Sequence, residues 1–295
     1  MLSQHLTRVF LATTTVALLF PVSAAAQNNR SFVATTGNDA NNCSAAAFCR
    51  TFTAALAVTN PGGEIVVVNS GGYGPATINQ PVTINAIGID ASITQTASGQ
   101  VAINITTTGN VTLNGLNLNG GGTGQAGIDA GNVGFLRLYN MQIQNFTGPC
   151  VFFGSSGNMA MYDSKASDCL NGVVVNAAGS RVYVNNTAFD HNSTSGAIAF
   201  AGELTVADSS AHSNGAGFTA AGGNVALYND RATFNGTGLA ASAGRLDFAN
   251  CLISFNEGSF AITGTGTMGG TNPGTSLITS GQGSNGSLST ANVLQ

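Results

Sequence analysis

Four polar side chains are spaced along the chain in a way that could bring them together. Lys165, Asp190, His212 and Arg231 follow one another at similar intervals. An imidazole oriented by a carboxylate can act as a general base, and a nearby cation can stabilise developing negative charge. His212 would be the base, Asp190 its orienting partner, Arg231 a clamp for a sugar carboxylate, and Lys165 an outlying substrate contact. The alternative, which we favour, is a solvated charge cluster on a surface that carries little charge.

These side chains can be aligned because residues 136–262 consist of short repeats. Each repeat opens with alternating apolar residues followed by Asn or Asp. The period is about 22 residues, whereas helical-hairpin repeats need more than about 30, and one coil of a parallel β-solenoid fits it. We therefore predict an all-β, right-handed parallel β-helix with three short strands in each coil. The residues predicted to face inward are Leu136, Leu138, Met159, Met161, Val182, Val184, Leu204, Val206, Val225, Leu227, Leu246 and Phe248.

The repeat also places the four polar side chains. Asp190 and His212 occupy the same position in neighbouring coils, so their backbones should lie one strand spacing apart, about 4.8 Å. Arg231 lies one coil further and two residues back, roughly 8 Å away by the same geometry. All four are expected to point outward from the second strand of the coil, and a slip of one residue would turn them inward.

An Asn or Asp followed six residues later by Asn is the most regular motif of the repeat. The pairs are Asn186 and Asn192, Asp208 and Asn214, Asn229 and Asn235, and Asn250 and Asn256. Asn tolerates left-handed backbone, and stacked amides can bond one another. We interpret the motif as structural, the alternative being a row of ligand-binding amides. The carboxylates of Asp163 and Asp208, two coils apart in the first column of this motif, are likewise interpreted as structural.

Three tyrosines on the outer face of the first strand, Tyr162, Tyr183 and Tyr228, are the candidate carbohydrate contacts. Aromatic side chains combine an apolar ring with a polar tip, which suits the stacking of sugars. Packing on the outer sheet would place tyrosines there equally well.

The composition limits the partners and the compartment. Charged residues make up 7% of the chain and the net charge is −4, so there is no basic stripe of the kind that binds nucleic acid. Residues 1–26 have the features of a cleavable secretory signal, with an apolar stretch too short to span a bilayer. We expect a secreted, extracellular or periplasmic protein with no membrane span.

An exported chain can form disulfides. Cys43 and Cys49 bracket a short loop and are predicted to pair. Alignment of the repeats puts Cys169 opposite Asn145 and Cys150 five positions further along, so a bridge between these two is not expected. Cys251 is expected to be a buried thiol.

The remaining boundaries come from composition. Residues 27–63 are predicted to form an N-terminal cap with a helix over 51–58, residues 64–264 the β-helix, and residues 265–295 a C-terminal cap and tail rich in Gly, Ser and Thr. A cap is needed because the end of a solenoid exposes both its core and an unpaired sheet edge.

The N-terminal stretch carries a specific resemblance. The segments 33–39, 49–56, 63–68 and 71–74 resemble the entry segment of secreted members of the right-handed parallel β-helix, or pectate-lyase-like, superfamily. The resemblance covers about residues 31–264. It implies the fold strongly and carbohydrate as a ligand less strongly, because members include lyases, hydrolases, epimerases and proteins without assigned activity.

Pectate lyases place several calcium-binding carboxylates beside an Arg base, usually on the outer face of the first strand. Here Asp247 is the one carboxylate at those positions, and calcium wants six to eight oxygen ligands, so the lyase residues cannot be carried over. No metal or cofactor is predicted. The expectation is a non-catalytic exported solenoid that engages polysaccharide or a cell-surface component. The alternative is a polysaccharide lyase or epimerase acting on uronic-acid polymers.

Overall fold

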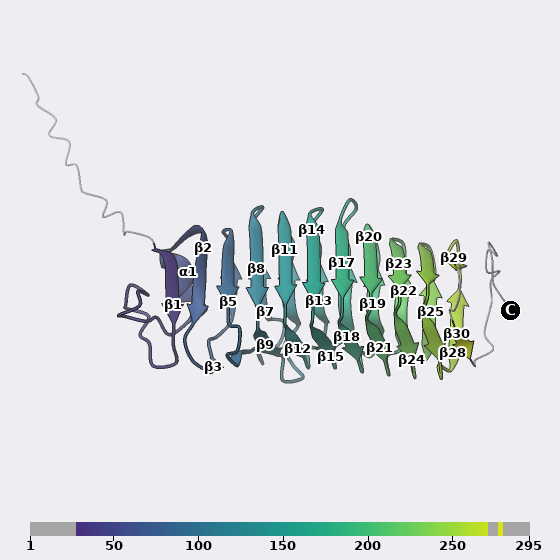
Figure 1. Ribbon diagram of the computed structural model, residues 1–295, viewed down its shortest axis with the longest axis horizontal. Helices are drawn as coiled ribbons and strands as arrows, with labels where there is room; N and C mark the ends of the chain where they lie inside the picture. The colour runs from purple at the N-terminus through teal and green to yellow at the C-terminus, as the bar shows by residue number, and fades with distance from the viewer. Residues whose placement is uncertain (1–27, 271–276, 280–295) are drawn as a thin grey trace, which may run out of the picture.

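A computed structural model describes residues 28–270 and 277–279. The chain winds into a parallel β-solenoid whose coils stack along one long axis (Figure 1). Each regular coil contributes one strand to each of three parallel sheets, which have 11, 10 and 9 strands and are called here sheets 1, 2 and 3 in the order the chain visits them. Turn 1 joins sheet 1 to sheet 2, and turn 2 joins sheet 2 to sheet 3. The predicted fold is confirmed.

Sheet 1 contains β1 (Asn28–Val33), β2 (Thr59–Val67), β5 (Val82–Asn85), β8 (Asn110–Asn114), β11 (Phe135–Tyr139), β14 (Asn158–Tyr162), β17 (Arg181–Asn185), β20 (Glu203–Ala207), β23 (Asn224–Tyr228), β26 (Arg245–Ala249) and β29 (Thr267–Gly270). Sheet 2 contains β3 (Gly71–Gly72), β6 (Ala91–Thr94), β9 (Leu116–Asn119), β12 (Gln142–Gln144), β15 (Lys165–Ser167), β18 (Ala188–Asp190), β21 (Ser210–His212), β24 (Arg231–Thr233), β27 (Leu252–Ser254) and β30 (Leu277–Thr279). Sheet 3 contains β4 (Ala76–Ile78), β7 (Val101–Ile105), β10 (Ala126–Ala130), β13 (Pro149–Phe153), β16 (Asn171–Val175), β19 (Ser195–Ala199), β22 (Ala216–Ala220), β25 (Thr237–Ala241) and β28 (Gly258–Ile262).

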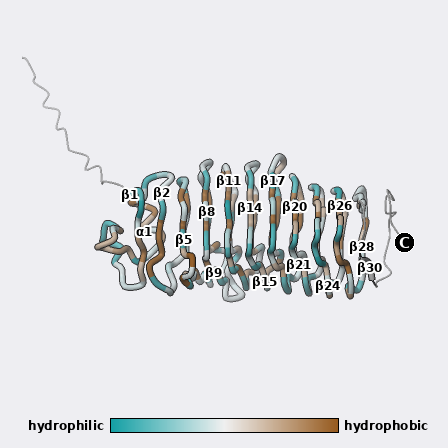
Figure 2. Tube along the Cα trace, in the orientation of Figure 1, coloured by the Kyte–Doolittle hydropathy of each residue, from teal (hydrophilic) through white to brown (hydrophobic). Residues whose placement is uncertain are grey.

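The core is built from the alternating residues of sheet 1 together with inward residues of the other two sheets. Side chains alternate between the two faces of a strand, and the strands of sheet 1 alternate between hydrophilic and hydrophobic colours along their length (Figure 2). Leu136, Met159, Val182, Leu204 and Val225 pair in one register from coil to coil. All the residues predicted to face inward are buried, which confirms that set.

The N-terminal end is closed by the predicted helix. Helix α1 (Phe52–Val58) begins at Thr51, whose side chain accepts a hydrogen bond from the amide of Ala54 and so caps the helix. It packs against β1, β2 and β4 at the purple end of the molecule (Figure 1). Strand β2 follows the helix directly, and Asn60-Pro61-Gly62-Gly63 forms a bulge between the pairs Asn28–Thr59 and Arg30–Glu64.

The loop between Cys43 and Cys49 protects the outer edge of the first strand. The predicted disulfide joins these two residues. Phe32 in β1 donates its N–H to the Cys43 carbonyl at 2.8 Å and accepts one from Cys49 at 3.1 Å. The open edge of sheet 1 is therefore paired within the chain rather than left free to bind another strand.

A second disulfide joins Cys150 to Cys169, with 5.7 Å between their Cα atoms, and the expectation that these cysteines do not pair was wrong. The error lies in the register. Turn 2 after β12 spans residues 145–148, whereas turn 2 after β15 spans residues 168–170. Because the second turn is one residue shorter, Val151 pairs with Val173, and the repeat alignment misplaced Cys150. Cys251 belongs to neither disulfide and is buried, as predicted.

The Cys150–Cys169 bridge replaces a pair of residues that recurs in other coils. There, a glycine of sheet 3 leaves room for an asparagine in turn 2 of the next coil. A Cβ on Gly217 would lie 3.2 Å from the Asn235 amide nitrogen, and one on Gly238 would lie 2.8 Å from that of Asn256. Cys150 occupies the glycine position and Cys169 the asparagine position.

The asparagines of turn 2 form a buried hydrogen-bonded ladder, called here the inner ladder, made of Asn192, Asn214, Asn235 and Asn256. The side-chain amide of Asn192 donates to Oδ1 of Asn214 at 2.9 Å, and the next two steps are 3.0 Å each. The same oxygens accept the backbone N–H groups of the coil before. The structural interpretation of this half of the motif is confirmed.

The predicted signal, residues 1–26, lies outside the described residues, as do residues 271–276 and 280–295 of the predicted C-terminal segment.

Candidate functional site: a polar groove along turn 1

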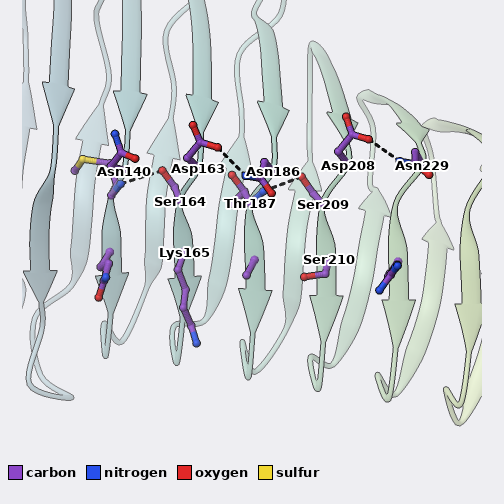
Figure 3. A pocket seen from close by; sticks show the side chains of 14 residues that line it. Asn140, Asp163, Ser164, Lys165, Asn186, Thr187, Asp208, Ser209, Ser210 and Asn229 are labelled. Atoms are coloured by element: carbon purple, nitrogen blue, oxygen red, sulfur yellow. Dashed lines mark hydrogen bonds between the residues drawn. The ribbon is translucent and has the colours of Figure 1, made fainter. Parts of the chain in front are cut away.

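An open groove of about 670 Å³ runs along turn 1 between sheets 1 and 2. It extends over five successive coils, so its long axis follows the axis of the solenoid (Figure 3). Nearly all of its lining side chains are polar. The lining residues are Asn140, Met141, Gln142, Asp163, Ser164, Lys165, Asn186, Thr187, Ala188, Asp208, Ser209, Ser210, Asn229 and Arg231.

The first column of the Asn/Asp motif is called here the outer ladder: Asn140, Asp163, Asn186, Asp208, Asn229 and Asn250. All of these except Asn250 line one wall of the groove. All six have positive φ angles, between 46° and 59°, the left-handed region that Asn and Asp tolerate best among non-glycine residues. The Asn186 amide donates to Asp163 at 2.7 Å, and the Asn229 amide donates to Asp208 at 2.6 Å. Amides and carboxylates thus alternate from Asn140 to Asn229, and Asp163 and Asp208 each accept a hydrogen bond from the asparagine of the next coil.

The outer ladder differs from the inner ladder in exposure. Asp163, Asn186 and Asp208 are exposed at the surface, whereas Asn192 and Asn214 are buried. The outer ladder therefore has donors and acceptors left for solvent or a ligand, and the inner ladder does not. This distinction could not be read from the sequence, because both columns show the same residue types at the same period.

The floor of the groove is a column of buried hydroxyl groups. The Oγ of Ser164 accepts the N–H of Met141 at 3.0 Å, and the Oγ of Ser209 accepts that of Thr187 at 3.1 Å. The hydroxyls of Ser164, Thr187 and Ser209 each also donate to the backbone carbonyl two residues earlier. The floor is thereby a rigid, repeating surface.

The next member of the floor column is Asp230, a buried carboxyl group with 1% of its surface exposed. Its oxygens accept the N–H groups of Ser209 at 2.8 Å and of Tyr228 at 2.9 Å. Burial raises the pKa of Asp230 from 3.8 to about 7; the two hydrogen bonds lower it, and the charge of nearby Asp208 raises it further. Beyond it in the column, burial raises the pKa of the Cys251 thiol to about 11.

The four candidate catalytic residues divide between the two edges of sheet 2. Lys165 and Arg231 line the groove, whereas Asp190 and His212 pair in register two residues further along the strands. Asp190 forms an ion pair with Lys165 at 3.0 Å. The Nδ1 atom of His212 lies 3.3 Å from the Thr233 hydroxyl. The structure thus places Asp190 against the lysine rather than against the imidazole that it was predicted to orient.

The tyrosines belong to the strands of sheet 1 and are not among the residues that line the groove. Tyr139 and Tyr162 directly precede outer-ladder residues, and their rings stack with centroids 5.3 Å apart. Tyr183 lies on the neighbouring column, 5.8 Å from the Tyr162 ring. Tyr228 stands apart on β23, with 58% of its surface exposed. The candidate contacts therefore form one cluster and one separate ring, and Tyr139 joins the cluster unpredicted.

The sequence analysis missed the groove and the burial of Asp230. One signal was available for Asp230. Counting one repeat back at a time along the chain from Asp230 gives Ser209, Thr187 and Ser164, so a carboxylate replaces the hydroxyl that the three preceding coils carry.

Two further findings concern the residues 28–270 and 277–279. No group of three or more His, Cys, Asp or Glu side chains in them is placed to hold a metal ion. No helix among them is long and apolar enough to cross a membrane.

Comparison with known proteins identifies the class. A family model described as a right-handed β-helix region matches residues 85–234, half of the chain, and the protein belongs to this family. Among solved structures, the pectate lyase Pel9A matches with a TM-score of 0.60 and 16% identity over 84% of this chain and 75% of that chain. XylC, solved in complex with xylose, matches with a TM-score of 0.64 and 10% identity over 82% of this chain and 68% of that chain. No curated protein matches.

Proposed function

We propose that the protein is an exported β-helix that binds a polysaccharide chain along the turn-1 groove and does not cleave it. The observation that carries the proposal is the form of the groove: it is open, polar, elongated along the solenoid axis and lined by the same kinds of group in successive coils. Strand spacing repeats these groups about every 4.8 Å. A ligand that is itself a chain of hydroxyl-bearing units can bond to several coils in succession.

The chemistry of the walls supports a polyhydroxyl ligand. Carboxylates such as Asp163 accept hydrogen bonds, and amides such as Asn186 both donate and accept, so a sugar hydroxyl finds a partner in either role. Tyr162, which directly precedes the lining residue Asp163, adds an apolar ring with a polar tip. The two cations that line the groove, Lys165 and Arg231, are matched in number by the two carboxylates, Asp163 and Asp208.

Export is supported by two features. Residues 1–26 have the composition of a secretory signal, and the described part of the chain contains two disulfides, which persist in oxidising compartments. Of the two structural neighbours, one is a pectate lyase and the other was solved in complex with xylose. Their identity to this chain is low, so the likeness concerns the fold, and the proposal rests on the groove.

The test is to fill the groove with an apolar side chain. Ala188 lines the groove, and Leu252 occupies the same column three coils further on, so the column accepts leucine. We expect Ala188→Leu to weaken binding to a soluble polysaccharide at least about tenfold, which corresponds to about 1.4 kcal/mol. Ala226→Leu, on the outer face of sheet 1, is the matched control and should bind as the wild type does. Affinity electrophoresis against neutral and uronic-acid polymers measures both.

The alternative function is a lyase or epimerase acting on uronic-acid polymers through Asp190, His212 and Arg231, with Lys165 as an outlying contact. Absorbance of unsaturated product would reveal a lyase, and NMR of the polymer an epimerase. If either appears, His212→Ala should slow it at least about 100-fold and change stability by less than about 0.5 kcal/mol. Turnover of any polymer would overturn the non-catalytic proposal. Equal binding by the Ala188 and Ala226 variants would overturn the groove as the site.

A further inference from the structure

An exposed row of aromatic rings runs along turn 2, on the edge of sheet 2 away from the groove. It consists of His191, His212, Phe234 and Phe255, from four successive coils, and is called here the aromatic row. The centroid distances from ring to ring are 6.2, 5.2 and 5.2 Å. The last two rings are nearly parallel, with an interplanar angle of 12°. Phe234 is 56% exposed and Phe255 is 64% exposed.

The backbone conformation at the two phenylalanines is energetically unfavourable for a bulky side chain. Phe234 and Phe255 both have φ of 57°, in the left-handed region where a bulky side chain is an outlier. The same column holds Asn145, Asp168 and Ser213 in earlier coils, all with similar positive φ. Small polar residues can therefore adopt the backbone conformation that this turn requires. Phenylalanine at the same position adds both backbone strain and exposed apolar surface. Strained and exposed side chains of this kind point to a function rather than to stability.

The row is continuous because the His212 ring bridges the coil in which the turn-2 column has no aromatic residue. Ser213 interrupts the column, and His212, the preceding residue, contacts both His191 and Phe234. The polar groups of the adjoining column of sheet 2 flank the rings, with Asp190 and Thr233 in register beside His212. The aromatic row is therefore an exposed line of rings with hydrogen-bonding groups along one side.

We propose that the aromatic row is a second carbohydrate-binding site, which takes a neutral polysaccharide lying along the solenoid axis. Covering the C–H groups of a sugar ring with an apolar surface lowers the free energy of the complex. The hydroxyl groups of the sugar can form hydrogen bonds with the flanking polar groups. The row contains no Lys or Arg, and exposed Asp168 and Glu257 stand near its two ends. These carboxylates favour a neutral polymer over an acidic one.

The dimensions favour a single polymer chain over a protein. A phenylalanine or tyrosine side chain offers roughly 150–250 Å², and only part of each is exposed here. A stable protein interface buries about 800 Å² on each partner. A row of four rings that is one side chain wide does not provide this area. The proposal is independent of the turn-1 groove, because the two sites share no ring and lie on opposite edges of sheet 2.

The test uses residues that the column already accepts. The double variant Phe234→Asn with Phe255→Asn restores the residue type found at Asn145 and should melt at or above the temperature of the wild type. We expect it to bind xylan and hydroxyethyl cellulose at least about tenfold more weakly in affinity electrophoresis. Phe200→Asn, at a phenylalanine that is 48% exposed away from the row, is the control and should bind as the wild type does.

The two sites can be distinguished by combining variants. If the row is a separate site, the double variant should lose affinity in the Ala188→Leu background as well as in the wild type. Unchanged binding of both neutral polymers by the double variant overturns the proposal, as does a wild type that binds neither. If light scattering shows a wild-type dimer that the double variant abolishes, while binding of the polymers is unchanged, the row is a self-association surface and the proposal is wrong.

Discussion

Replacing Asp230 by serine should stabilise the protein at alkaline pH and change it much less at acidic pH. Asp230 is almost fully buried in the floor of the groove, and burial raises its pKa from 3.8 to about 7. The folded state therefore favours the protonated carboxyl group. A group whose folded pKa is raised contributes its stability fully below the unfolded pKa, and this contribution is lost as the pH rises through the folded pKa. For Asp230 the loss begins near pH 4 and is nearly complete somewhat above pH 7.

The size of the effect follows from the displacement of the pKa. About three pKa units correspond to roughly 4 kcal/mol over the whole range. Of this, about 2 to 3 kcal/mol should be lost between about pH 5 and about pH 8. Serine fits the site, because Ser164 and Ser209 hold the same place in earlier coils and accept the same backbone N–H. Asp230→Ser should therefore gain about 2 to 3 kcal/mol over the wild type on going from about pH 5 to about pH 8.

The assay is denaturant unfolding followed by circular dichroism at several pH values for the two proteins. The control is Asp168→Ser, which removes an exposed aspartate from a column that holds Ser213 naturally. Its pH dependence should follow that of the wild type. A difference of less than about 0.5 kcal/mol is what an ordinary surface substitution produces. If the Asp230→Ser profile runs parallel to the wild-type profile within that margin, Asp230 is not held protonated by burial and the reasoning fails.

Three further predictions concern the solenoid itself. Val206→Asp places an unpaired charge in the fully buried centre of a coil, so no soluble protein with a β-rich circular dichroism spectrum should be recovered; a folded variant would contradict the core assignment. Asn214→Leu leaves the buried amide groups of Asn192 without their acceptor and should cost about 2 to 4 kcal/mol in denaturant unfolding, and a cost below about 0.5 kcal/mol would mean that the inner ladder is dispensable. Opening the Cys150–Cys169 bridge by Cys150→Ser releases a loop closed over a separation of 19 residues and should cost about 3 kcal/mol; an unchanged melting temperature would show that packing, not the cross-link, holds these coils together.

Much of the coil could be predicted because its pattern is local. Alternation with period two decides which face a side chain takes, so Val182 and Val184 could be assigned to the core without knowledge of their partners. The regular return of Asn once in every repeat likewise indicated a stacked column of amides. The short loop between Cys43 and Cys49 identified its own disulfide, since the two residues are close in the chain.

The features that bear on function depend on which residues of different coils share a column and on what covers that column. Cys169 in turn 2 lies beside Cys150 at the start of sheet 3 in the preceding coil. The two residues hold different positions in the repeat, so alignment of the repeats could not reveal the contact. The columns of Asn186 and Asn192 are alike in sequence, yet turn 1 leaves one open to a groove and turn 2 buries the other. Asp230 acquires its raised pKa only because the neighbouring coils exclude water from it. Local periodicity thus determined the coil, and the lateral packing of coils decided which polar and aromatic groups are exposed, which are buried, and which lie together.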